Sequence, residues 1–153
     1  MKRIFSIVLA ALCLLSLAAC TDSATKDIDI AAVKEQIITD LAIEGAMDVE
    51  SDRLLNLYGI AAEDVAESAC FVTIEGVFPD EIVMVKATDA DAAKRVAESL
   101  NTRLDEVKVQ SQSYDPENYA IAQECQVLTE GNVVALFLSP KHAEMEEIFS
   151  SAE

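Results

Sequence analysis

Two segments of the chain carry apolar residues at helical spacing over several turns. The first covers residues 30–42 and is preceded by Asp29, which is placed to cap the helix. The second begins in a capping box made by Thr88 and Asp91. Its apolar residues fall on one side of the helix: Ala93, Val96, Ala97, Leu100, Leu104 and Val107. Each segment is therefore expected to pack one face against a core.

Three shorter helices are indicated mainly by the residues at their ends. They cover residues 51–58, 115–123 and 139–149. The first begins with a serine N-cap and is followed by a glycine, a common helix end. The second opens with Asp-Pro, which combines a capping side chain with proline at the first helical position. The third opens with Ser-Pro, and its inward-facing residues are Met145, Ile148 and Phe149.

Four segments rich in apolar and β-branched residues predict strands: 66–74, 81–87, 125–129 and 133–138. Gly76 and Pro79 make a turn between the first two strands, and residues 130–132 join the last two. The chain is therefore expected to form two hairpins, which cannot give a purely parallel sheet. The fold class predicted is α+β: an antiparallel sheet of about four strands with helices packed mainly on one face.

The first twenty residues have the pattern of a secretory signal. Lys2 and Arg3 are followed by an apolar run from Ile4 to Ala19. This run is shorter than the roughly twenty residues that a permanent membrane-spanning helix needs. It also lacks the polar stripe of a helix that packs on a globular core.

The run ends Leu17-Ala18-Ala19-Cys20, which resembles the lipobox of bacterial lipoproteins. The resemblance implies that Cys20 is modified with diacylglycerol and that the chain is cut just before it. Two acyl chains suffice for stable anchoring, whereas one holds only marginally. The alternative is an ordinary secretory signal cut nearby. We expect residues 1–19 to be the signal peptide and residues 20–27 a lipidated cysteine with a flexible tether. Residues 28–153 then form one extracytoplasmic domain, lipid-anchored at the cell membrane.

The composition narrows the range of partners. The formal net charge is −17, and removal of residues 1–19 takes away two cations and no acids. Such a surface argues against nucleic acid, whose binding depends on Lys and Arg neutralising phosphates. It also argues against a domain that lies flat on anionic lipid. The acids are dispersed, so solubility is their default role, and weak binding of cations or of a basic protein stays open.

Two cysteines belong to the expected domain, Cys70 and Cys125. Export permits a disulfide between them, and a bridge closing a loop of about 55 residues would contribute roughly 4 kcal/mol in the chain-entropy model. The alternative is two free thiols, which are among the most buried side chains in proteins. The sequence leaves both alternatives open.

The sequence offers little catalytic apparatus. His142 is the only histidine, and we expect it to be exposed in the first turn of the last helix. A zinc site needs three or four suitable ligands, so no metal site and no cofactor is predicted. No nucleophile elbow or glycine-rich phosphate loop is present in the sequence.

Carboxylates and tyrosines are the remaining candidates for a site. The acids form two groups, each at a predicted helix start: Asp48, Glu50 and Asp52, and Asp89 with Asp91. The helix dipole accounts for both groups without catalysis, and the first fails the EF-hand pattern because Arg53 stands at position six. A carbohydrate-binding face could use Tyr58, Tyr114 and Tyr119. The favoured interpretation is that Tyr114 and Tyr119 pack a short helix on the sheet.

Together with the lipobox, several short motifs resemble a family of small bacterial lipoproteins known as domain of unknown function 4358. They are Leu57-Tyr58-Gly59-Ile60, Pro79-Asp80-Glu81-Ile82, Lys86, Arg103, Tyr114-Asp115-Pro116-Glu117 and Glu130-Gly131-Asn132-Val133-Val134. The resemblance spans most of residues 50–150. It implies a membrane-tethered extracytoplasmic domain, mostly in Gram-positive bacteria, and it implies no activity. The pair Cys70 and Cys125 is not part of the pattern.

The leading functional hypothesis is a non-enzymatic binding or interaction domain held at the membrane by the lipid on Cys20. The alternative is an accessory or sensor subunit of an envelope complex, with a protein of the envelope as partner. An enzyme that uses only carboxylates is a third class, because paired carboxylates can carry out acid–base chemistry without histidine.

Overall fold

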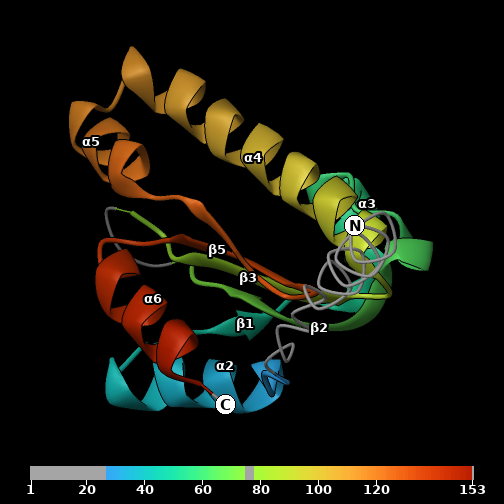
Figure 1. Cartoon of the computed structure of the whole chain (residues 1–153). Helices are drawn as coiled ribbons and strands as arrows, with labels where there is room; N and C mark the ends of the chain where they lie inside the picture. Colours follow the sequence, from blue (N-terminus) through green and yellow to red (C-terminus); the bar gives the residue numbers. More distant parts are fainter. Residues whose placement is uncertain (1–26, 75–77, 153) are drawn as a thin grey trace, which may run out of the picture.

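The computed structural model describes residues 27–74 and 78–152. The described segments form a central antiparallel sheet with a helical layer on each side (Figure 1). The helices are α2 (Ile30–Asp40), α3 (Leu54–Tyr58), α4 (Ala90–Gln112), α5 (Pro116–Glu124) and α6 (His142–Ser151). The strands are β1 (Met47–Asp48), β2 (Val65–Val72), β3 (Glu81–Ala87), β4 (Val127–Glu130) and β5 (Val133–Leu138). Residues 1–26, which include the expected signal peptide and Cys20, lie outside the described residues.

The sheet has the strand order β1-β2-β3-β5-β4, and every neighbouring pair is antiparallel. Both predicted hairpins are present, β2–β3 and β4–β5, and they meet through the pairing of β3 with β5. The central strands are the most buried, since all six residues of β5 are inaccessible to solvent. The α+β class and the antiparallel sheet are confirmed.

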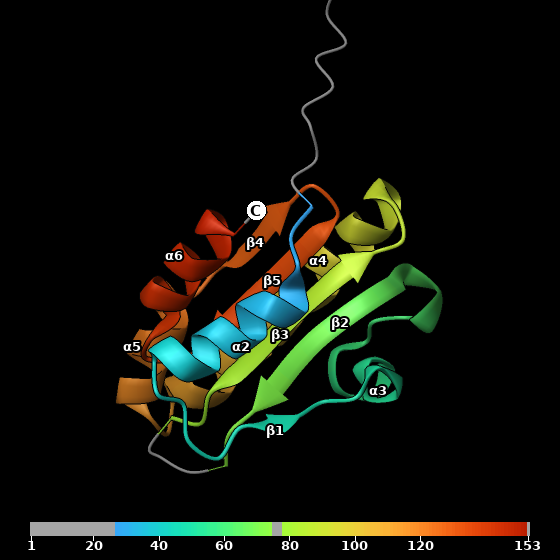
Figure 2. The same cartoon turned by 90° about the horizontal axis from the view of Figure 1, so that it is seen from below.

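Helices cover both faces of the sheet, which corrects the expectation that they lie mainly on one. Seen from below, α2 and α6 lie across one face, with α4 and α5 behind the sheet (Figure 2). The α4 side packs on alternate strand residues such as Val83, Val85 and Leu136. The α2 and α6 side packs on the residues between them, such as Met84 and Phe137. This is why β3 and β5 are nearly continuous apolar runs: a strand buried on both faces has no polar alternation.

The sheet also contains a fifth strand that the sequence did not predict. Strand β1 consists only of Met47 and Asp48, paired with Val72 and Phe71 of β2. Two residues have no periodicity to recognise, so this strand exists through its pairing with β2 rather than through a local pattern.

The helix ends agree with the predictions in part. Asp29 caps α2 through the Ala32 N–H, and Asp115 caps α5 through the Asn118 N–H. Helix α4 is capped by Asp89, not by Thr88 as predicted: the Asp89 carboxylate accepts the N–H groups of Asp91 and Ala92. Ser51 makes no side-chain cap either, because the chain there forms a 3-10 turn before α3.

Gly59 ends α3 in the left-handed conformation, at φ of 70°, as its position after the helix predicted. This cap turns the chain back toward β2, so Tyr58 stays buried at the helix end. None of the helices formed by the described residues has the length and apolarity needed to cross a membrane.

Candidate functional site

Glu81 and Arg103 form a two-point ion pair between the sheet and α4. Glu81 is the first residue of β3, and Arg103 lies on the side of α4 that faces it. The Arg103 Nε donates to Glu81 Oε1 at 2.8 Å, and its Nη2 donates to Oε2 at 2.6 Å. The side chains are 27% and 16% exposed, so the pair is largely withdrawn from water. The hydrogen bonds to Glu81 raise the pKa of Arg103, which keeps the guanidinium charged.

Tyr58, at the end of α3, lies beside this ion pair. It is only 7% exposed, and its hydroxyl has no hydrogen-bond partner within the described residues. Burial raises the pKa of the phenol, and the nearby negative charge of Glu81 adds to the shift. The hydroxyl therefore stays protonated and is a free hydrogen-bond donor. Among the described residues the Tyr58 hydroxyl is not one of the fully buried, unsatisfied polar atoms, so it can be reached from the surface and can donate to a bound molecule.

Tyr58 lines a hollow of about 540 Å³, which we call the Tyr58 hollow. Its rim carries two apolar side chains, Met47 and Leu57, which are 44% and 43% exposed. Arg53 also lines the hollow and has no ion pair within the described residues. The remaining lining residues are Asp48, Val49, Glu50, Asn56, Val72, Glu81 and Arg103. The volume falls in the range of small-molecule sites, and the lining combines apolar contacts with a few polar groups.

The strand register explains why these residues meet. Met47 of β1, Val72 of β2 and Glu81 of β3 are directly paired neighbours across the sheet. Helix α4 crosses the same face and brings Arg103 over Glu81. On the other side of the ion pair a smaller hollow, of about 360 Å³, is lined by Pro79 and Asp115 among others. Residues from four of the motifs that suggested a family thus converge around one ion pair.

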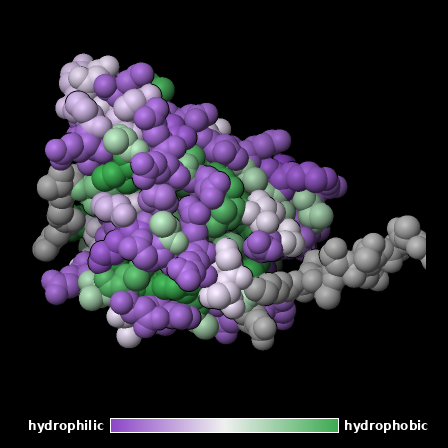
Figure 3. All heavy atoms as spheres, turned by 60° about the vertical axis from the view of Figure 1, so that its left-hand side comes forward, coloured by the Kyte–Doolittle hydropathy of each residue, from purple (hydrophilic) through white to green (hydrophobic). Residues whose placement is uncertain are grey.

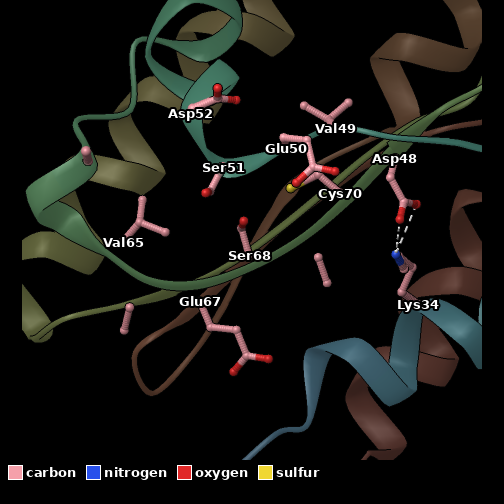
Figure 4. Close-up of a pocket in the computed structure, with 13 residues that line it drawn as sticks. Lys34, Asp48, Val49, Glu50, Ser51, Asp52, Val65, Glu67, Ser68 and Cys70 are labelled. Carbon is pink, nitrogen blue, oxygen red and sulfur yellow. Dashed lines mark hydrogen bonds and ion pairs between the residues drawn. The ribbon is translucent and has the colours of Figure 1, made fainter.

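A second hollow, of about 510 Å³, lies along the free edge of β2 and is shown in Figure 4. We call it the β2-edge groove. Its walls are the segment Asp48–Asp52 on one side and Val65–Cys70 on the other. Lys34 is the one basic residue in the lining, and its Nζ lies 3.0 Å from Asp48. The groove is therefore acidic.

The two predicted acidic groups lie in different surroundings. Asp48, Glu50 and Asp52 all line the β2-edge groove, but within the described residues no three His, Cys, Asp or Glu side chains are arranged to hold an ion. Asp89 caps α4, and Asp91 pairs with Lys94 at 2.8 Å on the surface of the same helix. Their positions fit the structural role that the sequence analysis gave them.

His142 is not exposed as predicted, because its side chain is only 15% accessible. The ring lies between two carboxylates, with Nδ1 3.4 Å from Glu146 and Nε2 3.6 Å from Glu124. The nearby Ser139 is wholly buried and donates its hydroxyl proton to Asp80 at 2.6 Å. His142 does stand in the first turn of α6, as predicted.

Cys70 and Cys125 are free thiols, and both are buried. Cys70 lies on β2, whereas Cys125 precedes β4 at the opposite side of the sheet, with β3 and β5 between them. Three strand spacings amount to roughly 14 Å, about twice the Cα separation that a disulfide spans. Burial raises the pKa of the Cys70 thiol to about 11, so this thiol is unreactive near neutral pH.

Tyr114 does not pack on the sheet as favoured, since it is 92% exposed at the turn before α5. Tyr119 is half-buried on α5, and its hydroxyl accepts hydrogen bonds from the side chains of Gln123 and Gln112, at 3.0 and 3.5 Å. Tyr58, the third candidate, lines a hollow of its own.

Sequence reasoning found part of this site. Tyr58, Glu81 and Arg103 all lay in the motifs of the family resemblance, but nothing local indicated that they touch. Met47 and Arg53 were not singled out, because an exposed methionine and a lone surface arginine have no distinguishing pattern. Glu81 directly precedes the apolar run of β3, and a carboxylate at the start of such a strand was an available signal for a buried charge that needs a cationic partner.

Comparison with known proteins gives a family and no function. The family described as Domain of unknown function (DUF4358) matches residues 39–139, about two thirds of the chain. No curated protein and no solved structure was found to match. The lipobox lies before the matched residues, whereas the other motifs of the resemblance fall inside them, with Tyr58, Glu81 and Arg103 among their residues. The chain therefore belongs to the DUF4358 family.

Proposed function

We propose that this chain is a lipid-anchored, extracytoplasmic and non-enzymatic binding domain, and that its ligand site is the Tyr58 hollow. The observation that carries the proposal is the Tyr58 hydroxyl. Tyr58 is largely buried and lines a hollow large enough for a small molecule or a partner's side chain, and its protonated hydroxyl forms no hydrogen bond within the described residues. A ligand that accepts its hydrogen bond would satisfy it.

The chemistry of the lining favours binding over catalysis. Glu81 and Arg103 are engaged with each other, so neither is free to exchange a proton with a substrate. The phenol of Tyr58 holds its proton firmly because its pKa is raised. The groups left for a ligand are thus the hydroxyl of Tyr58, the guanidinium of Arg53, the polar side chains of Glu50 and Asn56, and the apolar rim of Met47 and Leu57.

The position of the hollow suits a tethered domain. Asp27, the first described residue, pairs with Lys86 near the end of β3, whereas the hollow surrounds Glu81 at the start of that strand. Five residues of strand separate the two by roughly 17 Å. If the chain is anchored through the residues before Asp27, the hollow opens at the end of the sheet away from the anchor.

The Tyr58 hollow is tested by ligand screening with the full chain. Small molecules are screened by thermal shift on the wild type, on Tyr58→Phe and on Tyr114→Phe, whose tyrosine is exposed far from the hollow. We expect a hit that raises the Tm of the wild type and of Tyr114→Phe but binds Tyr58→Phe about 5- to 10-fold more weakly, since one hydrogen bond is lost. Hits that bind all three proteins equally would place the ligand site elsewhere.

The lipid anchor is tested separately. Cys20→Ala is expected to release the protein from membranes of the native host, because the acyl chains have no other attachment point in the proposal. Cys13→Ala, a cysteine within the same expected signal, is the matched control and should stay membrane-bound. Firm membrane association of Cys20→Ala would contradict the anchor but would leave the Tyr58 hollow untouched.

The second candidate function is an accessory or sensor subunit of an envelope complex. It is favoured by the apolar side chains Met47, Leu55 and Leu57, which are 43–59% exposed on and around α3. Exposed apolar side chains grouped around a hollow are typical of protein contact sites. A crosslinked partner from host membranes that is lost in a Leu55→Asp/Leu57→Asp variant would favour this function over a small-molecule ligand.

A further inference from the structure

Strand β1 leaves the edge of the sheet early and exposes the rest of β2. Its last contact with β2 is the hydrogen bond from the Val49 N–H to the Cys70 carbonyl, at 3.0 Å. The chain then turns away into the 3-10 turn Ser51–Arg53. Among the described residues, no strand pairs with the outer side of Val65–Ala69. A lane that one more strand could fill therefore runs beside β2.

The backbone of β2 presents hydrogen-bonding groups to this lane. The Cys70 carbonyl points outward to Val49, and residues two apart in a strand point their backbone groups the same way. Ser68 therefore directs its N–H and C=O into the lane, while Glu67 and Ala69 point theirs toward β3. The open stretch of four to five residues is roughly 15 Å long, enough for a short extended segment.

The unpaired edge of β2 forms the floor of the β2-edge groove, whose side chains line this lane. In Figure 4, Ser51 and Ser68 point toward one another across it, and Glu67 points to the far side of β2. Glu50 and Asp52 have no ion-pair partner within the described residues, whereas Asp48 is paired with Lys34. Glu67 lies opposite Lys86 in the β2–β3 pairing, and the two charges interact. Two carboxylates without a cationic partner, with Glu67 beyond them, thus lie beside an open strand edge.

The negative charge around the lane indicates which kind of segment can bind there. A second copy of this chain would bring the same three carboxylates against themselves, on molecules with a formal charge of −17 each. An extended segment bearing lysine or arginine would instead pair with them while its backbone completes the sheet edge. The field of the acidic surface would also speed its arrival.

We propose that the lane beside β2 is a docking site for an extended, cationic segment of another protein, which adds to the sheet as an edge strand. The segment forms backbone hydrogen bonds with Ser68 and places lysine or arginine side chains near Glu50, Asp52 and Glu67. This is strand addition, in which the main chain supplies affinity and the alternate side chains supply selectivity. The site is separate from the Tyr58 hollow and shares only the wall Asp48–Glu50 with it.

The test uses the full chain and a labelled Val-Lys-Val-Lys-Val peptide, with binding followed by fluorescence anisotropy. The wild type is expected to bind this peptide and not a Val-Glu-Val-Glu-Val peptide. Neutralising the groove with Glu50→Gln, Asp52→Asn and Glu67→Gln together should weaken binding about tenfold. The matched control carries the same change of charge at exposed acids outside the groove: Glu35→Gln, Glu98→Gln and Glu147→Gln. It should bind nearly as well as the wild type.

A backbone test separates strand addition from charge attraction alone. Ser68→Pro removes the outward N–H, and Ser68→Ala keeps it, so binding should be lost in the first variant and retained in the second. On binding, hydrogen exchange of the wild-type segment 65–69 should slow. Equal binding by the groove-neutralised protein and its control would overturn the proposal, and so would unchanged exchange at 65–69. Failure of the wild type to bind the peptide at about millimolar concentration would also overturn it.

Discussion

Glu81 and Arg103 stand 22 positions apart in the sequence and meet because α4 crosses the sheet over the start of β3. A carboxylate that is only 16% exposed loses most of its hydration on folding. The two hydrogen bonds from Arg103 replace the lost hydration, and Tyr58 packs beside the resulting neutral pair. The two charges depend on each other, so removing one is worse than removing both.

This dependence predicts the stability of variants of the ion pair. Arg103→Met should lower the free energy of unfolding by about 1–3 kcal/mol, because the Glu81 carboxylate is left half-buried without a donor. The double variant Arg103→Met/Glu81→Gln should recover most of this loss. Urea unfolding followed by circular dichroism measures both changes.

Lys94→Met provides the control for the loss of a cation from α4. Lys94 lies on the same helix and pairs with Asp91 in full contact with water, so its removal should leave the unfolding curve almost unchanged. If Arg103→Met were as stable as Lys94→Met, the ion pair could not be what fixes Tyr58 and the floor of the hollow.

At the residue scale the sequence could suggest Tyr58, Glu81 and Arg103 only one at a time, through family motifs. Their contact depends on the angle at which α4 crosses the sheet, which no local pattern records. His142 shows the same difficulty, because Glu146 was foreseeable from its spacing of four along α6 but Glu124 comes from α5. The sequence therefore does not predict the hydrogen bonds and ion pairs that join side chains on different helices and strands.

At the element scale, long apolar runs in the sequence were what located the central strands. The predicted limits of β3 and β5, residues 81–87 and 133–138, are those of the structure, because strands buried on both faces contain almost nothing but apolar residues. Strand β1 was missed because its two residues depend on β2. The helix α2 also ends at Asp40, slightly earlier than predicted, since Ala42 takes a positive φ of 48° and turns the chain toward β1.

The start of α4 gives a prediction at this scale. Asp89→Ala should lower the free energy of unfolding by about 1 kcal/mol, because the side chain accepts two of the N–H groups that the helix leaves unpaired. Thr88→Ala should cost less, since the Thr88 hydroxyl only donates a long, 3.3 Å hydrogen bond to the Glu63 carbonyl. Thermal unfolding of the two variants measures the difference. A larger loss of stability in Thr88→Ala would mean that Thr88 caps the helix, as the sequence suggested.

At the scale of the whole molecule, an acidic surface surrounds a strongly apolar sheet. The face shown in Figure 3 carries hydrophobic residues in small groups separated by hydrophilic ones. Acids outnumber basic residues by 28 to 11, so nearly every exposed region tends toward negative potential. Because the negative potential is spread over the surface, it does not by itself select one partner, and selective binding needs a site with a defined shape. The two hollows on either side of the segment Asp48–Glu50 are such sites.

The family match does not cover the molecule evenly. Residues 39–139 include the whole sheet with α3, α4 and α5, but only the end of α2 and nothing of α6. The unmatched helices are the two that cover the second face, where Phe149 of α6 meets Phe137 of β5 with ring centroids 5.8 Å apart. Strand residues on that face are fully buried beneath them, including Phe71, Ile82, Met84 and Phe137.

A fragment of residues 39–139 should therefore fail to form a native structure by itself, although it contains the entire family region and the Tyr58 hollow. Without α2 and α6, one face of the sheet would expose a contiguous apolar surface, which drives aggregation or leaves a loosely packed state. We expect the fragment to bind the dye ANS and to unfold without a cooperative transition, whereas residues 27–152 show neither property. A cooperative, ANS-negative fragment would mean that the α4 face alone holds the sheet together and that the helices on the second face are additions to a self-sufficient core. The continuous apolar runs of β3 and β5 argue against that outcome, because a strand with one solvated face would be expected to alternate.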